Sequence, residues 1–553
     1  MSRRAGAMPQ GGGFGSELGS FARFLRGLPR FLSQRMTYDQ ARAIVLERIR
    51  TRDAAFLSAV RDRVFGNPRS PYRALFEIAG CELGDVETVL ASDGVEGTLH
   101  KLRDAGVYLS FEEFKGRAPI VRSGRTVEVA PEDFDNPAFG SYFHITTGGS
   151  TGAGRRVLMD LEYFASRVPI NIVVEGCLGL RGLPSLHWFD IPPGHGLGSV
   201  LQGVPAERVP ERWYTPIRGG LDGTSIRFRL ATQATLTVAR LAGHRLPWPK
   251  YLPLDRAEVI VHWIRDTLRA RGPCVVRGQV SRMLRVAVAA KEMGVDLTGA
   301  VLVGGGEPPT TAKVATIQST GATFRSSYFF VEAGPVGYSC TTSSDPNDQH
   351  LFKDHLAMIQ AERQVPGFDL TVGAFYYTTL LPSSPKLLLN VESDDYGVLE
   401  RRSCGCPFEE LGFTDHVSEI RSFKKLSGEG VTLIGSEMEQ VLEEVLPARF
   451  GGSPLDYQLV EEEDEHGFTR LTLLVAPTVA LSDERAAVNA VLEGLSTCGA
   501  AGDLSRALFR QADTLRVRRE APRLTRHGKF MPLQLARARR DGAGGSSPDR
   551  PRG

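Results

Sequence analysis

The segment GPCVVRGQVSRMLRVAVAAKEMGVDLTGAVLVGGGEPP, residues 272–309, decides the fold class. Residues 274–276 predict a short buried strand, residues 281–293 predict a helix with one apolar face, and residues 300–303 predict a second buried strand. The second strand runs into a glycine-rich loop. A strand, a helix and a strand in this order are typical of an α/β unit, so we expect an α/β fold with a parallel sheet.

The chain has 553 residues, which is too long for one ordinary core and predicts a few domains. After Arg421 the charge rises, residues 436–447 predict a helix with Met438, Val441, Leu442 and Val445 on its apolar side, and residues 470–476 predict a strand. This pattern indicates a smaller α+β domain. The expected organisation is a disordered tail at 1–17, a large domain at 18–420, a small domain at 421–536 and a disordered tail at 537–553.

The composition is that of a soluble globular protein, with 42% apolar and 24% charged residues and a net charge of +2. The near balance of charge argues against nucleic acid as a partner. Residues 21–36 form a short basic amphipathic stretch, which we interpret as a surface helix rather than a membrane contact. With no long apolar segment and no export signal, we expect a cytoplasmic protein without stable membrane insertion. The odd number of cysteines, seven, argues against a disulfide framework.

The strongest local motif is HITTGGSTGAGRRV, residues 144–157, which follows a short apolar strand. Its glycines allow successive backbone amides to point into one concavity, where they bind an anion, and its hydroxyl and arginine side chains add donors. The motif is not a Walker A loop, because Arg155 and Arg156 stand where that loop needs lysine and a hydroxyl residue. An ordinary flexible loop is the alternative, and the strand and the paired arginines favour a phosphate site.

This loop resembles the phosphate-binding signature T-S-G-T-T-G-x-P-K of the adenylate-forming acyl-CoA synthetase superfamily. The resemblance places the signature on Thr147, Gly148, Gly149, Ser150, Thr151, Gly152 and Arg155, with Gly154 in place of the usual proline. It implies a large α/β domain with a small mobile C-terminal domain. It also implies ATP and Mg²⁺ as cofactors and a carboxylic acid as the substrate.

Further motifs of the superfamily follow in the expected order. VGGGEPP, residues 303–309, resembles the segment that lines the adenine and acyl pockets, with Gly305 and Glu307 in its G-G-E positions. In SSYFFVEAGPVGYSC, residues 326–340, the resemblance gives Tyr328 the adenine-stacking role and Glu332 the role of a Mg²⁺ ligand.

The later motifs carry the ribose contact, the hinge and the catalytic lysine. In LLLNVESDDYG, residues 387–397, Asp395 matches the aspartate that binds the ribose hydroxyls, and Asp394 is its rival. Arg421 matches the hinge arginine. In APRLTRHGKFMPL, residues 521–533, Lys529 matches the lysine that neutralises the approaching carboxylate and phosphate.

Within the superfamily the chain most resembles the phenylacetate–CoA ligase branch, with its coenzyme F390 synthetase-like and LuxE-like acyl-protein synthetase relatives. Some proteins of this branch hold a structural zinc ion with one cysteine, one histidine and a C-x-C pair. The resemblance assigns these ligands to Cys340, His350, Cys404 and Cys406, with His355 as a rival for His350. Free buried cysteines are the alternative.

The resemblance places the acyl pocket near residues 187–200, 278–308 and 330, which gives His195, Phe330 and Ala333 as substrate-binding candidates. The apolar and aromatic character of these segments favours an aryl or fatty acid. We expect ATP-dependent formation of an acyl-adenylate and transfer of the acyl group to CoA. An amine, an alcohol or a carrier-protein thiol is the alternative acceptor. For the assembly, we consider a homodimer. The alternative from another functional class is a non-catalytic nucleotide-binding scaffold.

Overall fold

The computed structural model describes most of the chain, with gaps. The described residues are 14–136, 142–146, 156–219, 221, 226–307, 309–343, 345–364, 371–422, 425–428, 431–434, 438, 441–496, 499–523 and 532–534. Within them, every helix is too short or too polar to span a lipid bilayer. The predicted phosphate loop at 147–155, the catalytic candidate Lys529 and the tail at 537–553 lie outside the described residues.

The centre of the molecule is a twelve-stranded sheet in the order β13-β14-β15-β16-β12-β11-β10-β9-β8-β5-β6-β7. The half from β10 to β7 is parallel. Its strands are β10 (Thr323–Phe330), β9 (Ala300–Gly305), β8 (Cys274–Gln279), β5 (Ser185–Trp188), β6 (Arg212–Thr215) and β7 (Pro249–Tyr251). All six residues of β8 are buried, as expected for a parallel strand that is covered on both faces.

Six helices of the described chain accompany the parallel half, and among them α10 and α11 have clearly amphipathic sequences. The six are α7 (Leu161–Cys177), α8 (Gly196–Gly203), α9 (Ile226–Leu241), α10 (Glu258–Arg271), α11 (Val280–Glu292) and α12 (Thr311–Gln318). The predicted strand–helix–strand unit at 272–309 is confirmed by β8, α11 and β9, and β8 pairs with β9 in parallel as expected. The expected fold class, α/β, is therefore confirmed.

The other half of the sheet is antiparallel and was not anticipated in detail. It consists of β11 (Gly334–Tyr338), β12 (Gln349–Leu351), β16 (Asp415–Ser422), β15 (Val391–Arg401), β14 (Thr371–Thr379) and β13 (Leu356–Gln364). Outside this sheet, the hairpins that precede it along the chain are β1 (Ile120–Arg122) with β2 (Arg125–Val127), and β3 (Tyr142–Thr146) with β4 (Arg156–Asp160). The predicted phosphate loop connects β3 to β4.

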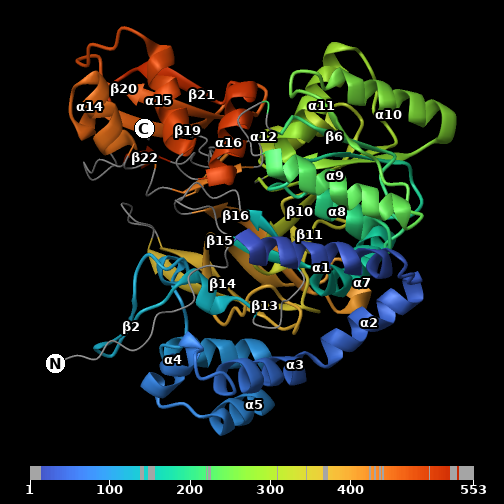
Figure 1. The fold of residues 1–553 in the computed structure, drawn as a ribbon, viewed down its shortest axis with the longest axis vertical. Coiled ribbons are helices and arrows are strands. Elements are labelled where there is room, and N and C mark those ends of the chain that lie inside the picture. The colour runs from blue at the N-terminus through green and yellow to red at the C-terminus, as the bar shows by residue number, and fades with distance from the viewer. Residues whose placement is uncertain are drawn as a thin grey trace, which may run out of the picture.

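A helical layer precedes the sheet along the chain. It comprises α1 (Phe14–Leu32), α2 (Tyr38–Arg50), α3 (Arg52–Ala59), a π-helical turn (Val60–Phe65), α4 (Pro71–Ala79), α5 (Leu83–Asp104) and α6 (Phe111–Phe114). Figure 1 shows α3, α4 and α5 at the base of the molecule, below β13 and β14. Buried side chains of these helices, such as Phe56, Leu75 and Leu99, share one core with Met358 and Tyr377 of the antiparallel strands.

The predicted disordered tail at 1–17 is wrong at its inner end, because α1 begins at Phe14. Glycine and serine dominate the composition there, but Phe24, Leu28 and Leu32 of the same helix are buried against the core. Tertiary burial of these side chains stabilises the helix despite the weak local propensity. The interpretation of residues 21–36 as part of a surface helix agrees with this packing.

The C-terminal part forms a separate four-stranded sheet, in the order β21-β20-β19-β22. Its elements are β19 (Tyr457–Glu463), β20 (Thr469–Val475), β21 (Leu515–Arg519), β22 (Leu533–Gln534), α14 (Leu446–Phe450), α15 (Glu484–Ser496) and α16 (Gly499–Ala512), after the hairpin β17 (Lys425–Gly428) and β18 (Val431–Ile434). Figure 1 shows this unit in orange and red, beside the green helices of the parallel half. The predicted strand at 470–476 is confirmed by β20.

Two details of the C-terminal predictions differ from the structure. The predicted boundary at 420/421 falls inside β16, which is hydrogen-bonded to β15 through Ser422, so the large sheet extends beyond it. In the predicted helix at 436–447, residues Val441–Val445 form a π-helical turn before α14. Because a π turn changes the angular phase of the helix, Val445 is 40% exposed, whereas Val441 and Leu442 are buried.

Candidate functional site

The predicted nucleotide residues Tyr328 and Asp395 are in direct contact. Tyr328 lies in β10 and Asp395 in β15, and the Tyr328 hydroxyl donates a hydrogen bond to Asp395 Oδ2 at 2.7 Å. Ser422 Oγ donates to Asp395 Oδ1 at 2.5 Å, and the hydroxyls of Tyr328 and Tyr377 are 2.7 Å apart. Burial and the neighbouring Asp395 carboxylate hold the pKa of Tyr328 well above its usual value. Asp395 is thus a buried carboxylate whose two oxygens each accept a hydroxyl.

The backbone around Asp395 is irregular. The register between β15 and β16 shifts between Tyr396 and Val398, which marks a bulge, and Asp394 has a positive φ of 68°. A Cβ on Gly397 would lie 2.5 Å from the carbonyl oxygen of Ser418, so this position requires glycine. Bulges of this kind re-aim side chains and are common next to functional sites. Asp394, the rival candidate, is fully buried and does not replace Asp395 as the partner of Tyr328.

Glu332 lies in the turn between β10 and β11 and is 2% exposed. Its Oε1 accepts a hydrogen bond from Lys115 Nζ at 2.9 Å, and both side chains are buried. Lys115 follows α6, and its ammonium lies 5.2 Å from the centroids of the Phe111 and Phe114 rings. A buried carboxylate beside a lysine surrounded by aromatic rings is a site of high charge density. No sequence motif points to this lysine, because it is 217 positions from Glu332 along the chain.

The hairpin that carries the predicted phosphate loop is connected through α7 to the turn that holds Glu332. The pairing of Thr146 with Arg156 brings the two ends of the loop together, and β4 continues into α7. In α7, the Tyr163 hydroxyl lies 2.9 Å from the position that a Cβ on Gly334 would take. Burial raises the pKa of Tyr163, and Glu332 adds to the increase. The start of α7 therefore packs against the turn that holds Glu332.

The G-G-E segment lies at the carboxyl end of β9. A Cβ on Gly305 would approach Ser327 Oγ to 2.5 Å, so a side chain there would force β9 and β10 apart. Glu307 is buried and its Oε1 accepts a hydrogen bond from Ser281 Oγ at 2.6 Å. Lys313 Nζ lies 3.8 Å from the other oxygen of Glu307. Glu307 thus ties β9 to α11 and α12 at the edge where the parallel strands end.

The predicted acyl-pocket residues separate into two environments. Phe330 and Ala333 are buried in the core below the antiparallel strands, and the Phe330 ring lies 5.1 Å from the Tyr377 ring. His195 instead contacts Phe329, with ring centroids 5.6 Å apart, and the Arg167 guanidinium lies 4.8 Å above the same Phe329 ring. The His195 side chain is exposed, yet the surrounding protein and Arg167 lower its pKa to about 4. His195 is therefore a neutral imidazole at neutral pH.

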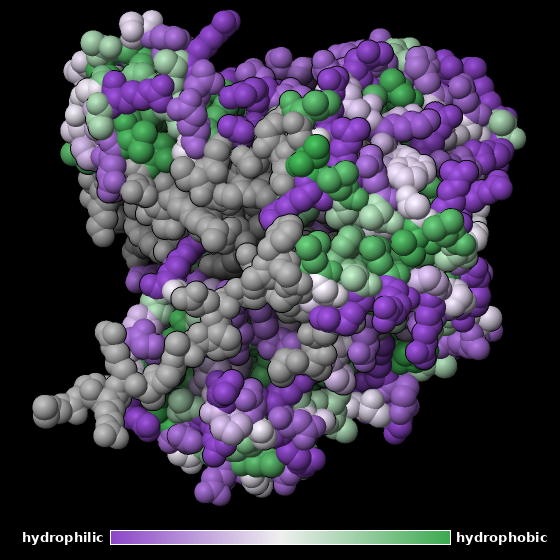
Figure 2. All heavy atoms as spheres, in the orientation of Figure 1, coloured by the Kyte–Doolittle hydropathy of each residue, from purple (hydrophilic) through white to green (hydrophobic). Residues whose placement is uncertain are grey.

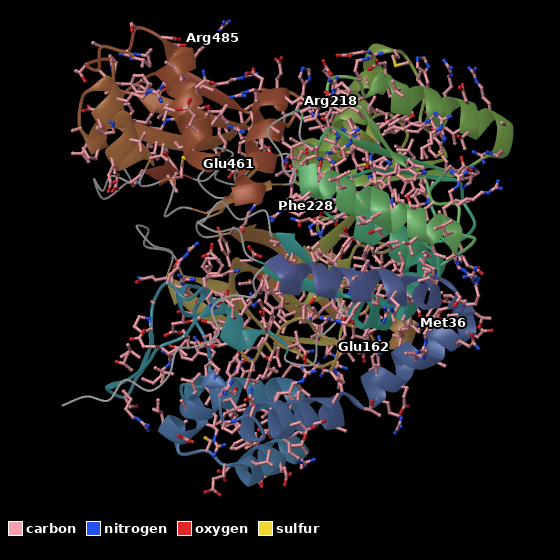
Figure 3. The ribbon with its side chains drawn as sticks, viewed as in Figure 1. Met36, Glu162, Arg218, Phe228, Glu461 and Arg485 are labelled. Carbon is pink, nitrogen blue, oxygen red and sulfur yellow. The ribbon has the colours of Figure 1, made fainter. Side chains whose placement is uncertain are left out.

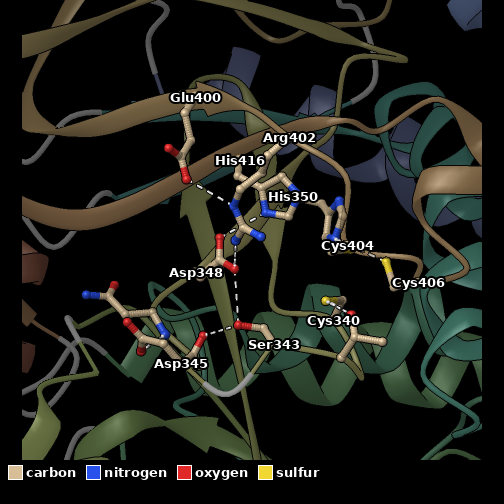
Figure 4. Close-up of polar contacts among 12 residues, drawn as sticks. Cys340, Ser343, Asp345, Asp348, His350, Glu400, Arg402, Cys404, Cys406 and His416 are labelled. Atoms are coloured by element: carbon tan, nitrogen blue, oxygen red, sulfur yellow. Dashed lines mark hydrogen bonds and ion pairs between the residues drawn. The ribbon is translucent and has the colours of Figure 1, made fainter.

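The four predicted metal ligands come together, although they lie on three separate segments. Cys340 follows β11, His350 lies in β12, and Cys404 and Cys406 lie in the connection from β15 to β16. Their ligand atoms all lie within 4.8 Å of one another. His355, the rival candidate, instead bonds Asp354 and the carbonyl oxygen of Pro335. Figure 4 shows His350 facing the thiols.

The hydrogen bonds of this cluster orient its ligand atoms toward one another, as a bound cation requires. Nδ1 of His350 lies 2.6 Å from the carbonyl oxygen of Phe413 and donates to it, so Nε2 faces the sulfurs of Cys406 at 3.1 Å and Cys404 at 3.4 Å. A hydrogen bond with Cys406 lowers the pKa of Cys340 to about 2 and raises the pKa of Cys406. A bound cation would hold all three sulfurs as thiolates. Three thiolates and an imidazole fit a closed tetrahedral zinc site.

Around the cluster, a second layer of polar groups fixes the ligands. The His416 ring packs on His350 with centroids 4.0 Å apart, and His416 Nδ1 lies 2.9 Å from Asp348. Figure 4 shows that Arg402 and Ser343 also donate hydrogen bonds to the Asp348 carboxylate. Such second-layer contacts orient metal ligands and determine affinity.

The hinge candidate Arg421 lies in β16, opposite Tyr396 of β15. Burial raises the pKa of Tyr396, and Arg421 opposes this increase, so the two side chains are close. Among the predicted residues, the structure thus brings together Tyr328, Asp395 and the strand that carries Arg421. The residues that sequence reasoning missed, Lys115 and Tyr377, contact the predicted ones only through tertiary structure.

The comparisons with known proteins give distant structural likenesses. No protein-family model matches the sequence, and no curated protein matches it. A 2-hydroxyisobutyryl-CoA ligase in complex with 2-HIB-AMP and CoA is similar at 17% identity and a TM-score of 0.49, over 92% of this chain and 91% of that chain. A malonyl-CoA ligase with methylmalonyl-CoA and AMP bound is similar at 14% identity and a TM-score of 0.40, over 77% and 82%. The amide bond synthetase McbA from Marinactinospora thermotolerans gives 13% identity and 0.38, over 90% and 98%. Likeness at this level does not establish a shared activity.

Proposed function

We propose that this protein is an adenylate-forming ligase that activates a carboxylic acid with ATP. In the first half-reaction a carboxylate oxygen attacks the α-phosphorus of ATP, the bond to the bridging oxygen breaks, and pyrophosphate leaves. The product is a mixed anhydride of the acid and AMP. In the second half-reaction a thiol sulfur, after losing its proton, attacks the carbonyl carbon of this anhydride, and AMP leaves. CoA is the acceptor we favour, and an amine or a carrier-protein thiol is the alternative.

One observation carries the proposal. Tyr328 and Asp395 were assigned from two motifs that are 67 positions apart, and the structure joins their side chains by a hydrogen bond of 2.7 Å. A buried carboxylate that already accepts two hydroxyls has the acceptors that a ribose with two hydroxyls requires. In the proposal the ribose takes the place of Tyr328 and Ser422 on Asp395, and the released Tyr328 ring lies against the base.

The phosphates are assigned to the other end of the site. The loop at 147–155 is proposed to bind the β- and γ-phosphates, and Glu332 is the carboxylate for Mg²⁺. The donor set fits this ion, since Mg²⁺ usually takes one or two protein carboxylates and completes its shell with phosphate oxygens and water. When bound, it would neutralise charge on the phosphates. Lys115 holds the Glu332 carboxylate in place, and Lys529 is proposed to lie between the carboxylate of the acid and the α-phosphate.

The branch assignment, phenylacetate–CoA ligase-like, is supported by the Cys340, His350, Cys404 and Cys406 cluster. All four residues were predicted from the resemblance to that branch, and their ligand atoms lie within 4.8 Å. The site is closed by four protein ligands, so the metal would be structural. In the proposal it holds the segment between β15 and β16, and with it Asp395 and Arg421, against the strand that follows Glu332.

Exchange of labelled pyrophosphate into ATP tests the proposal, with purified protein, Mg²⁺ and a panel of aryl, short-chain and fatty acids in the absence of any thiol. The proposal predicts exchange that depends on one class of acid. Absence of exchange with every acid, in a protein that binds ATP, would contradict it and would favour a nucleotide-binding scaffold. Addition of CoA or an amine to the active acid then identifies the acceptor.

A further inference from the structure

Helix α9 has two apolar faces, and the described part of the chain covers only the inner one. Phe228, Leu236 and Ala239 are buried on the inner face. On the outer face Ile226 is 60% exposed, Leu230 is 57% exposed and Leu241 is 82% exposed. Residues 226, 230, 237 and 241 fall on one side of an α-helix with 3.6 residues per turn. Figure 2 shows hydrophobic side chains gathered over α9 and the neighbouring part of α1.

Arginines flank this exposed stripe on both sides. At 3.6 residues per turn, Arg229 and Arg240 lie along one border of the stripe and Arg227 lies along the other. All three side chains are exposed. We call Ile226, Leu230, Leu241 and these three arginines the α9 surface. An apolar stripe bordered by cations is the arrangement of helices that lie in a membrane interface, where arginines reach the phosphates while leucines enter the acyl region.

The sequence that carries the α9 surface contains no acidic residue between Asp222 and Asp255. Residues 223–254 contain five lysines and arginines and no aspartate or glutamate, in a chain whose net charge is only +2. The excess of basic over acidic residues is therefore a property of this segment and not of the whole protein. A soluble surface helix normally mixes both signs of charge, whereas an acid-free surface is complementary to an anionic one.

Amphipathic aromatic residues extend the α9 surface toward the edge strand β7. Trp248 and Tyr251 are each 39% exposed. The Arg218 guanidinium stacks on Tyr251 at 4.0 Å, and the next residue, Gly219, lies against Arg229 of α9. Figure 3 shows Arg218 above Phe228 of α9 in this view. Tryptophan and tyrosine are the residues that prefer the headgroup region of a bilayer.

We propose that the α9 surface binds anionic phospholipid bilayers, so that the protein attaches peripherally to a membrane through α9. The occupant is a lipid surface rather than a protein, because the leucines project from a convex helix and exposed arginines border them on both sides. The surface also borders the predicted substrate region, since Gly219 lies against Ile191, in the segment that leads to His195. The proposal rests on the exposed side chains and holds whatever reaction the site performs.

Flotation of the full-length protein with vesicles tests the proposal. Vesicles of phosphatidylcholine mixed with an equal part of phosphatidylglycerol are expected to carry the protein, pure phosphatidylcholine vesicles to carry much less, and high salt to weaken the binding. The double variant L230S/L241S is expected to bind the anionic vesicles about tenfold more weakly or worse. R229Q/R240Q should also weaken binding, and more strongly at low salt. The matched control is L455S, because Leu455 is 62% exposed in the C-terminal unit.

The tryptophans supply an independent readout. Trp188, Trp213 and Trp263 are at most 6% exposed, so Trp248 is the tryptophan that a bilayer would reach first. Anionic vesicles are expected to shift its emission to shorter wavelength, and W248F should remove the shift while the flotation remains. All the variants change exposed side chains and should melt as the wild type does. Wild-type protein that stays with the soluble fraction, or L230S/L241S that floats like L455S, would overturn the proposal, and the former result would favour an acidic protein partner.

Discussion

At the scale of single residues, the site depends on buried charges whose partners come from distant parts of the chain. Glu332 is held by Lys115, and Asp395 is held by Tyr328 and Ser422. A donor faces each buried carboxylate and offsets part of the cost of removing it from water. The same donors keep the carboxylates in one position before the substrates arrive.

Asp395→Asn tests the assigned ribose contact. The substitution removes the charge while preserving the shape, and hydrogen bonds to a charged group are worth about 1.5–3 kcal/mol. ATP binding, measured by isothermal titration calorimetry, is expected to weaken about tenfold to a hundredfold. Tyr377→Phe is the matched control, because Tyr377 contacts the Tyr328 hydroxyl and should leave ATP binding almost unchanged. Equal affinity of Asp395→Asn and wild type would remove Asp395 from the nucleotide site.

Lys115→Met tests the buried ion pair. It removes the Lys115 ammonium from the buried Glu332 carboxylate, and breaking a buried ion pair is expected to lower the free energy of unfolding by about 3–5 kcal/mol. Denaturation with guanidinium measures this change, and adding Glu332→Gln should recover part of the loss. Lys101→Met is the control, because Lys101 and Asp93 form a largely exposed pair, which contributes about 1 kcal/mol at most. If both lysine variants lost the same small amount, the Lys115 pair would not hold the site together.

At the scale of secondary-structure elements, the Cys340, His350, Cys404 and Cys406 cluster connects the two regions of the antiparallel sheet that matter for the site. Cys340 lies just after β11 and His350 lies in β12, and both strands follow the Glu332 turn along the chain. Cys404 and Cys406 lie between β15, which carries Asp395, and β16, which carries Arg421. A metal bound there would fix these strands relative to one another.

Removal of the metal is therefore expected to loosen the sheet. We predict one zinc ion per purified chain by elemental analysis, and its loss in Cys406→Ser. Loss of the ion should lower the melting temperature by more than about 5 °C. Cys81→Ser is the control, because Cys81 lies outside the cluster. A wild-type chain that is free of zinc, and melts as Cys406→Ser does, would contradict a structural metal.

The extent to which sequence predicts this molecule differs from element to element. The strand–helix–strand unit at 272–309 was predictable, because its buried strands and amphipathic helix have clear periodicity. Residues 14–17 were not, because burial of Phe24 and Leu28 stabilises the helix more than composition suggests. The exposure of Val445 could not be predicted from α-helical periodicity, because a π-helical turn at Val441–Val445 interrupts it. Lys115 could not be found, since nothing local links it to Glu332.

At the scale of the whole molecule, a few polar contacts join the C-terminal unit to the large sheet domain. Lys313 Nζ donates to Thr469 Oγ1 at 2.9 Å, and the Gln511 side chain bonds the backbones of Leu254 and Pro216 at 2.8 and 3.1 Å. Apolar contacts also join them, since Phe468 of the C-terminal unit belongs to the same buried cluster as the parallel half and the Arg285 guanidinium lies 4.7 Å from its ring centroid. In the proposal this unit acts as a lid, so its contacts with the large domain would have to change between the two half-reactions.

Lys529→Ala tests the role proposed for the C-terminal unit. Loss of the cation between carboxylate and phosphate is expected to reduce pyrophosphate exchange about a hundredfold or more, while ATP binding and the melting temperature stay near wild-type values. Lys291→Ala, which changes an exposed lysine of α11, is the matched control and should keep full exchange. Full exchange in Lys529→Ala would refute the role assigned to this lysine.

The most direct test of acyl-adenylate formation follows one oxygen atom. The active acid, labelled in its carboxylate with a heavy oxygen isotope, is converted with ATP and the acceptor, and the products are analysed by mass spectrometry. The account predicts that one labelled oxygen passes from the acid to AMP, because the carboxylate oxygen bonds to the α-phosphorus and stays there when the acyl group leaves. Label in inorganic phosphate with release of ADP, or unlabelled AMP, would contradict it.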